Sequence, residues 1–277
     1  MPAKTVKNEK TRIGFLGAGK MAEAILAALI RNGIAPAAQI LACEIQSERR
    51  AFIRRRYQVA VTASPADVAK NCDVIFLAVK PQDLDALLAQ ISPLLGKKQV
   101  LVSIAAGKTL AHLQKQVGAG VRLVRVMPNL AVMVGEGMSV FCLGRHARPA
   151  DRGLAKKLLG CCGRVEELDE RHMDVVTALS GSGPAFFAYA MLAMADAAKA
   201  EGLPAGPARL LAEQTMLGAA KFLLETGREP AEFIQAVASP KGTTAAGLTV
   251  LDASDLRATL AKTIQAAARR SRELSAG

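Results

Sequence analysis

The chain has 277 residues, of which 51% are hydrophobic and 22% are charged, and it carries a formal net charge of +12. This composition is typical of a globular protein, and the length suits one large or two modest domains. The five cysteines never form a C-x-x-C pair and lie apart from the three histidines, so we expect neither a metal site nor ordinary disulfides. The basic residues are spread along the chain without a helix-turn-helix motif, which argues against nucleic acid and favours attraction of small anions.

The polar N-terminal residues and the most hydrophobic stretch of the chain both favour a cytoplasmic protein without a membrane partner. Residues 1–11 are polar and are predicted to form a loose tail rather than a signal segment. The most hydrophobic stretch, Val175–Ala195, contains no charge but is interrupted by Ser180-Gly181-Ser182-Gly183-Pro184. The apolar part after this proline is shorter than the roughly 20 residues that a bilayer requires.

Short apolar runs alternate with amphipathic helical segments between residues 12 and 168. Runs that are apolar at consecutive positions are typical of parallel strands covered on both faces, so this region is predicted to be a doubly wound α/β domain. The predicted helices are Met21–Arg31, Ser47–Arg56 and Asp83–Leu95. The predicted strands are Ile13–Leu16, Ile40–Cys43, Val74–Val79, Val100–Ile104 and Leu123–Met127, with Gly137–Leu143 and Arg164–Leu168 as additional strands that close the domain.

The remainder, residues 169–277, is predicted to be an all-α domain. Helices rich in Ala, Leu and Met are separated by Gly and Pro at 181–184, 202–207, 227–230 and 239–242. A helical domain that is so apolar, with so few aromatics, is expected to bury a face against a second subunit, giving at least a homodimer. A self-contained helical lobe on a monomer is the alternative. The long helices are predicted at Pro184–Glu201, Ala205–Glu225 and Asp255–Glu273.

A glycine-rich loop follows the first predicted strand directly. In the segment Gly17-x-Gly19-x-x-Ala22, the first glycine permits a tight turn and the second allows close approach of a pyrophosphate. The small third residue lets the following helix pack near the strand, and the helix N-terminus attracts the phosphates. Between the first strand and helix of an α/β domain, this pattern predicts a Rossmann-type dinucleotide site, whereas alone it would indicate only a turn.

The acidic residue Glu44 ends the second predicted strand, about 20 residues beyond the glycine loop. A carboxylate there accepts hydrogen bonds from the adenosine ribose and repels a 2′-phosphate, which favours NADH. Ser47, Arg49 and Arg50 lie near the same corner and could instead hold a phosphate. The alternative for Glu44 is a solvated strand end.

Six motifs, in this order, are more specific than any of them alone: Ile13–Ala22, Leu77–Pro81, Val102–Gly107, Arg125–Asn129, Leu179–Ala185 and Ser239–Leu248. Together they resemble the pyrroline-5-carboxylate reductase family over essentially the whole chain from Arg12 onward. The resemblance implies a dinucleotide-binding domain and a helical domain that interlocks with its partner in a homodimer; some members assemble dimers into rings. The implied reaction is hydride transfer from NADPH or NADH to the C=N carbon of a cyclic imine carboxylate, which converts 1-pyrroline-5-carboxylate to L-proline.

The resemblance also implies site residues. For the coenzyme, whose phosphate form the family tends to prefer, it implies Gly17, Ala18, Gly19, Lys20, Met21, Glu44, Ala78, Val79, Lys80, Pro81, Ala105 and Ala106, the last facing the nicotinamide. For the substrate it implies Asn129, Ser239, Lys241, Gly242, Thr243 and Thr244.

The loop from Ser239 to Thr244 precedes a predicted helix, so backbone N–H groups at Gly242, Thr243 and Thr244 can converge on a carboxylate. The Thr244 hydroxyl could bond the imine nitrogen and position or relay the proton, which makes Thr244 the candidate catalytic residue. The alternative is an ordinary helix start that Ser239 or Thr243 caps. Ser180–Pro184 is expected to be structural while lining the active-site cleft.

The chain departs from the family pattern at two places. Lys241 stands where the family often has Gly, so a positive φ there would strain the chain by about 1 kcal/mol or more. Its ammonium could alternatively help to bind the substrate carboxylate. Leu130-Ala131 stands where the family often has Thr-Pro, which places an apolar side chain near the predicted nicotinamide site.

Two other functions fit parts of the pattern. A β-hydroxyacid dehydrogenase would need a lysine early in the first long helix of the second domain, but that helix has no lysine before Lys199. A non-catalytic dinucleotide-binding paralogue, or one that reduces another cyclic imine, is supported only by the two departures.

Overall fold

The computed structural model describes residues 11–276, so the predicted tail 1–11 falls almost wholly outside the described residues. The chain divides into two compact units. The sheet unit runs to Gly181 and also includes the end of the chain from Ala267. The helical unit comprises Ser182–Ala266. The sheet unit is therefore formed by two separate parts of the sequence.

The sheet unit is built on eight strands in the order β3-β2-β1-β4-β5-β6-β7-β8. Strands β1 to β6 are parallel, β7 is antiparallel to β6, and β8 is parallel to β7. Successive strands are added outwards from β1 to β3 on one side and from β4 to β6 on the other, as in a doubly wound sheet. The strands are β1 (Ile13–Leu16), β2 (Ile40–Cys43), β3 (Ala60–Thr62), β4 (Val74–Leu77), β5 (Val100–Ser103), β6 (Arg122–Pro128), β7 (Gly137–Leu143) and β8 (Gly163–Glu167).

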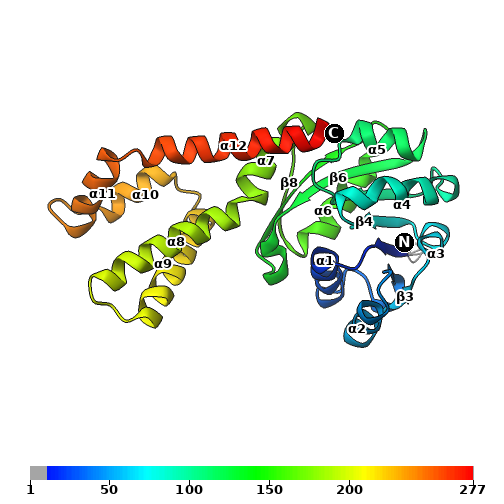
Figure 1. Cartoon of the computed structure of the whole chain (residues 1–277), viewed down its shortest axis with the longest axis horizontal. Helices are drawn as coiled ribbons and strands as arrows, with labels where there is room; N and C mark the ends of the chain where they lie inside the picture. Colours follow the sequence, from blue (N-terminus) through cyan, green and yellow to red (C-terminus); the bar gives the residue numbers. More distant parts are fainter. Residues whose placement is uncertain (1–10, 277) are drawn as a thin grey trace, which may run out of the picture. The chain divides into compact units, whose positions relative to one another are not determined.

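Helices cover both faces of this sheet (Figure 1). One core cluster packs α1, α2 and α6 on one face, and it includes Phe15 and Phe76, whose stacked rings lie 4.8 Å apart. The other cluster packs α3, α4 and α5 on the opposite face. Burial of both faces explains why the strands read as continuous apolar runs. The helices are α1 (Lys20–Arg31), α2 (Ser47–Tyr57), α3 (Pro65–Asn71), α4 (Leu84–Ile91), α5 (Leu110–Val117) and α6 (Pro149–Gly160).

The helical unit contains α8 (Gly183–Ala200), α9 (Ala205–Thr226), α10 (Pro230–Val237), α11 (Thr243–Ala253) and the first half of α12 (Leu256–Ala276). Helices α8 and α9 form an antiparallel pair (Figure 1). The rings of Phe222 and Phe233 stack 4.8 Å apart and join α9 to α10. The last turns of α12 belong to the sheet unit, where Ser271 Oγ donates to Asp174 Oδ1 at 2.7 Å.

The predicted fold class is confirmed, and the predicted strands overlap the observed ones, but two predictions need correction. The short strand β3 was not predicted, because its three residues carry too little pattern. The segment Ser180–Pro184 is not a loop between helices. Instead α7 (Met173–Val176) continues into a π-helical turn, Thr177–Gly181, and α8 starts after a bend at Ser182.

This continuity also corrects the expectation that the apolar stretch is too short for a bilayer. The helical run Glu170–Ala200 is long and apolar enough to cross a membrane by length and composition alone, with a mean hydropathy of 1.4. Only 17% of its most apolar window is buried within the chain.

Candidate functional site

The predicted coenzyme segments all follow the carboxyl ends of parallel strands. The glycine loop follows β1, Glu44 follows β2, Ala78 follows β4 and Ala105 follows β5. Main-chain hydrogen bonds tie these segments together: Gly17 N donates to Cys43 O at 2.9 Å, and Ala78 N donates to Leu16 O at 2.8 Å. Ligands of open α/β sheets bind at this edge, where the strand order reverses between β1 and β4. The structure thus gathers the predicted coenzyme residues at the switch point.

The glycine loop has the geometry of a cradle. Gly17 has φ +94°, and a Cβ there would lie 2.7 Å from Ala78 O, so the turn requires glycine. Gly19 is the N-cap of α1, and a Cβ there would meet nothing within 4 Å. This open space beside a helix N-terminus is where a pyrophosphate would come close to the backbone. Lys20 is exposed and Met21 is half-buried at the same helix start.

Two charged side chains bracket one residue of this loop. Ala18 N donates to Glu44 Oε2 at 3.2 Å, and Ala18 O accepts from Arg49 Nε at 2.7 Å. Glu44 Oε1 also accepts from Gln46 N at 3.1 Å, which fixes the carboxylate at the end of β2. We call the place where Ala18, Glu44 and Arg49 meet the adenosine corner, after the predicted role of Glu44. It presents an oriented carboxylate, not a freely solvated one.

The nearby arginines are held by the protein itself. Arg50 Nη1 donates to the carbonyl oxygens of Glu44 and Ile45, at 2.7 Å in each case. Arg49 Nη2 pairs with Glu23 Oε2 of α1, and Tyr57 OH donates to Glu23 Oε1 at 2.6 Å. Burial raises the pKa of Glu23, but hydrogen bonds from Tyr57 and Arg49 outweigh it and hold that pKa below its ordinary value. Neither Glu23 nor Tyr57 was predicted, because Glu23 lies 26 positions from Arg49 and 34 positions from Tyr57, and no local sequence pattern links residues so far apart.

The segments after β4 and β5 complete the edge. Ala78 and Val79 are half-buried and Lys80 is exposed before the short helix η2 (Pro81–Asp83). Ala105 is 4% exposed, whereas Ala106 is exposed and can face a ligand.

An ion-paired cluster joins these two segments. Asp85 Oδ1 lies 2.6 Å from His112 Nε2, and Asp85 Oδ2 lies 3.2 Å from Lys108 Nζ. The hydrogen bond from His112, followed by the one from Lys108, holds the pKa of Asp85 below its ordinary value despite partial burial. Because Asp85 lies on α4 and its partners follow β5, this cluster holds the two loops together.

Asn129 follows β6 at the same edge, but part of its side chain is already engaged. Its Oδ1 accepts from Met138 N at 3.2 Å, which orients the amide and leaves its Nδ2 group as the donor available to a ligand. The next helix, η4 (Leu130–Val134), exposes three apolar side chains, with Leu130 at 57%, Met133 at 50% and Val134 at 75%. The departure at Leu130 therefore places apolar surface beside the β6 end. The nearby π-turn packs Gly181 against Met127, and Ser180 Oγ is buried there without a hydrogen-bond partner among the described residues.

The predicted substrate loop lies in the helical unit, at the start of α11. Gly242 is the N-cap, so no side chain caps this helix, and Gly242 N donates to Ser239 O at 3.0 Å. The first N–H groups of a helix, here those of Thr243 and Thr244, have no partner within the helix. Lys241 has φ +60°, one of two positive φ angles at non-glycine positions among the described residues. The strain anticipated at this position is therefore present.

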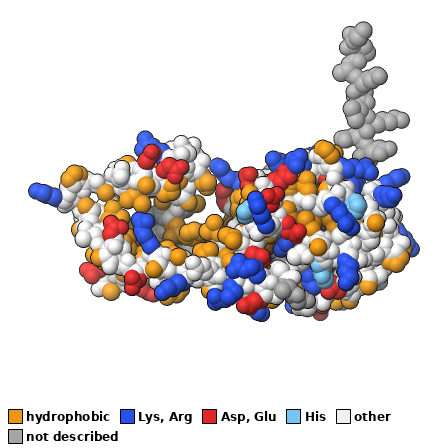
Figure 2. All heavy atoms as spheres, turned by 90° about the horizontal axis from the view of Figure 1, so that it is seen from above, with side chains coloured by type: hydrophobic (Ala, Val, Ile, Leu, Met, Phe, Trp, Pro, Cys, Tyr) orange, Lys and Arg blue, Asp and Glu red, His pale blue; other side chains and the backbone are white. Residues whose placement is uncertain are grey.

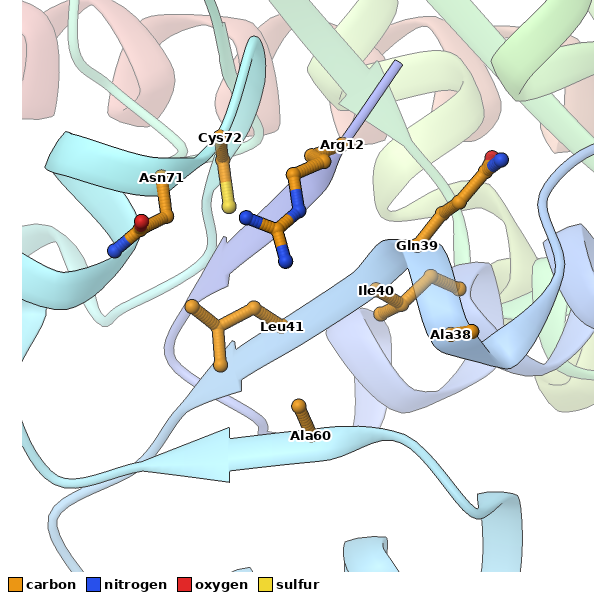
Figure 3. Close-up of a pocket in the computed structure, with 8 residues that line it drawn as sticks. All are labelled: Arg12, Ala38, Gln39, Ile40, Leu41, Ala60, Asn71 and Cys72. Atoms are coloured by element: carbon orange, nitrogen blue, oxygen red, sulfur yellow. The ribbon is translucent and has the colours of Figure 1, made fainter. Parts of the chain in front are cut away.

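Two cavities lie elsewhere on the sheet unit. One, of about 280 Å³, lies at the amino ends of the strands, where the Arg12 guanidinium points in among Ile40, Leu41, Asn71 and Cys72 (Figure 3). The other, of about 430 Å³, is lined by residues that include Leu110, Arg145 and Glu170. Neither includes a residue of the predicted coenzyme segments, and the first lies at the opposite edge of the sheet.

Family models match both parts of the chain. Residues 170–274 match the model described as pyrroline-5-carboxylate reductase dimerisation. Residues 12–107 match the model described as NADP oxidoreductase, coenzyme F420-dependent. The first match covers the apolar helical run Glu170–Ala200 completely.

Whole-chain comparisons agree with these matches. A pyrroline-5-carboxylate reductase of Glycine max is 40% identical over 267 residues, which is 96% of this chain and 97% of the relative. The structure of a pyrroline-5-carboxylate reductase from Coxiella burnetii, 33% identical, covers 96% of this chain and 99% of its own, with a TM-score of 0.92. A Plasmodium falciparum pyrroline carboxylate reductase with NADP bound is 27% identical over 96% of this chain and 99% of its own, with a TM-score of 0.86. The chain belongs to the pyrroline-5-carboxylate reductase family of oxidoreductases.

Proposed function

We propose that this protein reduces 1-pyrroline-5-carboxylate to L-proline by hydride transfer from NAD(P)H. The observation that carries the proposal is the likeness to pyrroline-5-carboxylate reductases along nearly the full length of both proteins. The gathering of Gly17–Met21, Glu44, Ala78–Pro81 and Ala105–Ala106 at one edge of the sheet supports it. When bound, the nicotinamide coenzyme supplies the hydride.

The residues at the sheet edge would hold and orient the coenzyme. The open side of Gly19 and the N-terminus of α1 fit a pyrophosphate. The fixed carboxylate of Glu44 fits a ribose 2′-hydroxyl and opposes a 2′-phosphate. We infer that this chain accepts NADH readily, although a relative binds NADP.

The residues at the start of α11 would hold the substrate. The N–H groups of Thr243 and Thr244 suit the carboxylate, whereas Gly242 N, which was predicted to join them, already donates to Ser239 O. Ser239 and the Lys241 ammonium lie in the same loop. The Thr244 hydroxyl would position the proton that the imine nitrogen receives as its carbon accepts the hydride. Asn129 would contribute through its Nδ2 group.

We further propose a cytoplasmic homodimer. Large apolar side chains are exposed across the helical unit, including Tyr189 at 76%, Val250 at 69% and Leu210 at 64% (Figure 2). We infer that self-association covers them, because the match to the dimerisation family includes this whole unit and the apolar run Glu170–Ala200 at its start. A ring of dimers would be a further step of the same association.

The activity is tested by measuring oxidation of NADH and of NADPH in the presence of 1-pyrroline-5-carboxylate. We expect proline to form in step with the oxidised coenzyme. Coenzyme binding without any turnover would contradict the reductase proposal and favour a non-catalytic paralogue. The dehydrogenase alternative has little support, since Lys199 lies at the far end of α8 and pairs with Asp196 at 2.6 Å.

The role of Thr244 is tested by Thr244→Ala. We expect kcat to fall by roughly ten- to hundredfold, the value of a lost hydrogen bond to a group that carries charge, while coenzyme affinity stays close to that of the wild type. Thr249→Ala is the matched control on the same helix, because Thr249 Oγ1 only donates to Ala245 O within α11. Loss of coenzyme binding in Thr244→Ala would remove the residue from the catalytic role.

A further inference from the structure

The adenosine corner contains an ion pair that the reaction itself does not require. Glu23 on α1 and Arg49 on α2 are joined through Oε2 and Nη2, and their side chains are only 22% and 25% exposed. Arg49 Nε is simultaneously bonded to Ala18 O. Two of the three guanidinium nitrogens of Arg49 therefore have protein partners, and its charge is balanced by an adjacent carboxylate.

Glu23 is itself held in place from the other side. Tyr57 OH donates to Glu23 Oε1 at 2.6 Å, so one carboxylate oxygen faces the tyrosine and the other faces the arginine. The Arg49 guanidinium also lies over the Phe52 ring, 5.1 Å from its centroid. Arg49 is therefore held by Glu23 on α1, by Ala18 of the glycine loop and by a ring of its own helix, so turning towards a ligand would break several contacts together.

The same arginine stands where a 2′-phosphate would arrive. Ala18 is bonded to Glu44 through its N–H and to Arg49 through its carbonyl, so both side chains border the same corner of the glycine loop. Arginine is the side chain best suited to hold a phosphate. The neighbouring Arg50 cannot take over this role, since its Nη1 is bonded to the carbonyl oxygens of Glu44 and Ile45.

We propose that Glu23 is a positioning residue for coenzyme choice: by retaining Arg49 it withholds the cation that a 2′-phosphate needs, and so favours NADH together with Glu44. The inference rests on the proposed function, since it concerns the coenzyme of that same site. Removing Glu44 alone takes away the repulsion but leaves Arg49 neutralised. Removing Glu23 as well releases Arg49 Nη2 and leaves the charge of the guanidinium unbalanced, so that it can pair with the phosphate while Nε keeps its bond to Ala18 O.

The test is a double-variant cycle with Glu44→Ser, Glu23→Gln and both together. The readout is the ratio of kcat/KM for NADPH to that for NADH, together with the affinities for adenosine 2′,5′-bisphosphate and for AMP. Glu44→Ser should raise the preference for the 2′-phosphate. Adding Glu23→Gln should raise it by about a further tenfold, the value of a charge-assisted hydrogen bond, and adding Arg49→Ala should abolish this second gain.

Glu48→Gln is the matched control, because Glu48 is an exposed acid on the first turn of α2 and lies outside this network. It removes the same charge, so a gain equal to that of Glu23→Gln would reduce the effect to general electrostatics and overturn the proposal. If Glu23 had only a structural role, Glu23→Gln would weaken the binding of both nucleotides equally and leave the ratio of kcat/KM for NADPH to that for NADH unchanged. This result would also overturn the proposal. If the wild type bound neither coenzyme, the proposed function would fail first, whereas an active wild type with an unchanged ratio in the variants refutes only the role of Glu23.

Discussion

Lys241 illustrates how one residue can oppose its local backbone. A φ of +60° costs an L-residue about 1–2 kcal/mol, and Lys241 adopts it at the turn before α11. Such strain often accompanies function. Lys241 lies next to the proposed carboxylate site, where its positive charge would attract the substrate carboxylate.

Lys241→Gly removes both the strained side chain and its charge, and two measurements separate the two effects. Relief of strain, less the larger backbone entropy of unfolded glycine, should stabilise the protein by about 0.5–1 kcal/mol in urea unfolding. If the ammonium attracts the substrate carboxylate, KM for the substrate should rise about threefold, as for an exposed ion pair.

Gln58→Gly is the control for this substitution. Gln58 has φ +56° at the end of α2, so it should show the same gain in stability with no change in substrate KM. A similar KM in wild type and Lys241→Gly would show that the lysine does not contact the substrate.

At the scale of elements, the loops after β4 and β5 are joined by Asp85, Lys108 and His112. The hydrogen bond from His112, with that from Lys108, keeps the pKa of Asp85 depressed in the folded state. A depressed carboxyl pKa contributes stability above the unfolded value, near 3.9, and this stability is lost as pH falls through the lower folded value. The contribution is modest because the Asp85 side chain is 44% exposed.

Asp85→Asn should therefore lower Tm by about 1–3 °C near pH 5 to 6. The difference from wild type should shrink as the pH falls below about 3.5 and at high salt, where the pair is screened. Thermal unfolding followed by circular dichroism across this range measures it. A difference that stayed constant with pH would mean that the cluster does not stabilise these loops electrostatically.

The elements themselves were mostly predictable, for a local reason. Strands β1, β2, β4 and β5 are buried on both faces, so their residues are apolar at consecutive positions and the strands can be recognised from the sequence. The short strand β3 at the sheet edge carries no such record, since it has one exposed and two half-buried residues. The helix predicted from Pro184 is confirmed, with Pro184 in the first turn of α8, but the π-helical turn Thr177–Gly181 before it was not predicted, because Gly and Pro normally interrupt a helix.

At the scale of the whole molecule, the apolar surface of the helical unit predicts association. Burying a leucine or valine contributes about 1.5–3 kcal/mol, so a charge placed in a subunit contact should weaken it strongly. Leu210→Glu combined with Val250→Glu should shift the protein from a dimer, twice 29.0 kDa, towards a 29.0 kDa monomer. Light scattering after gel filtration measures the mass, and a ring would appear as a multiple of the dimer.

Ile45→Glu controls for surface charge, because Ile45 is 80% exposed but lies in the sheet unit. Its mass should equal that of the wild type. A wild-type protein that ran as a monomer at micromolar concentration would contradict the proposed assembly.

The sequence by itself determined the doubly wound sheet, the helical second part and the glycine loop, because periodic burial and the steric demands of Gly17 are local properties. It also placed every predicted coenzyme segment after a strand. Only the tertiary structure decided how charges at the adenosine corner pair. Glu23, Arg49 and Glu44 come from three elements, and their contacts with Ala18 and Tyr57 depend on how α1, α2 and β2 pack. Sequence patterns record which residues are buried, whereas the choice of ionic partners depends on distances that packing alone sets.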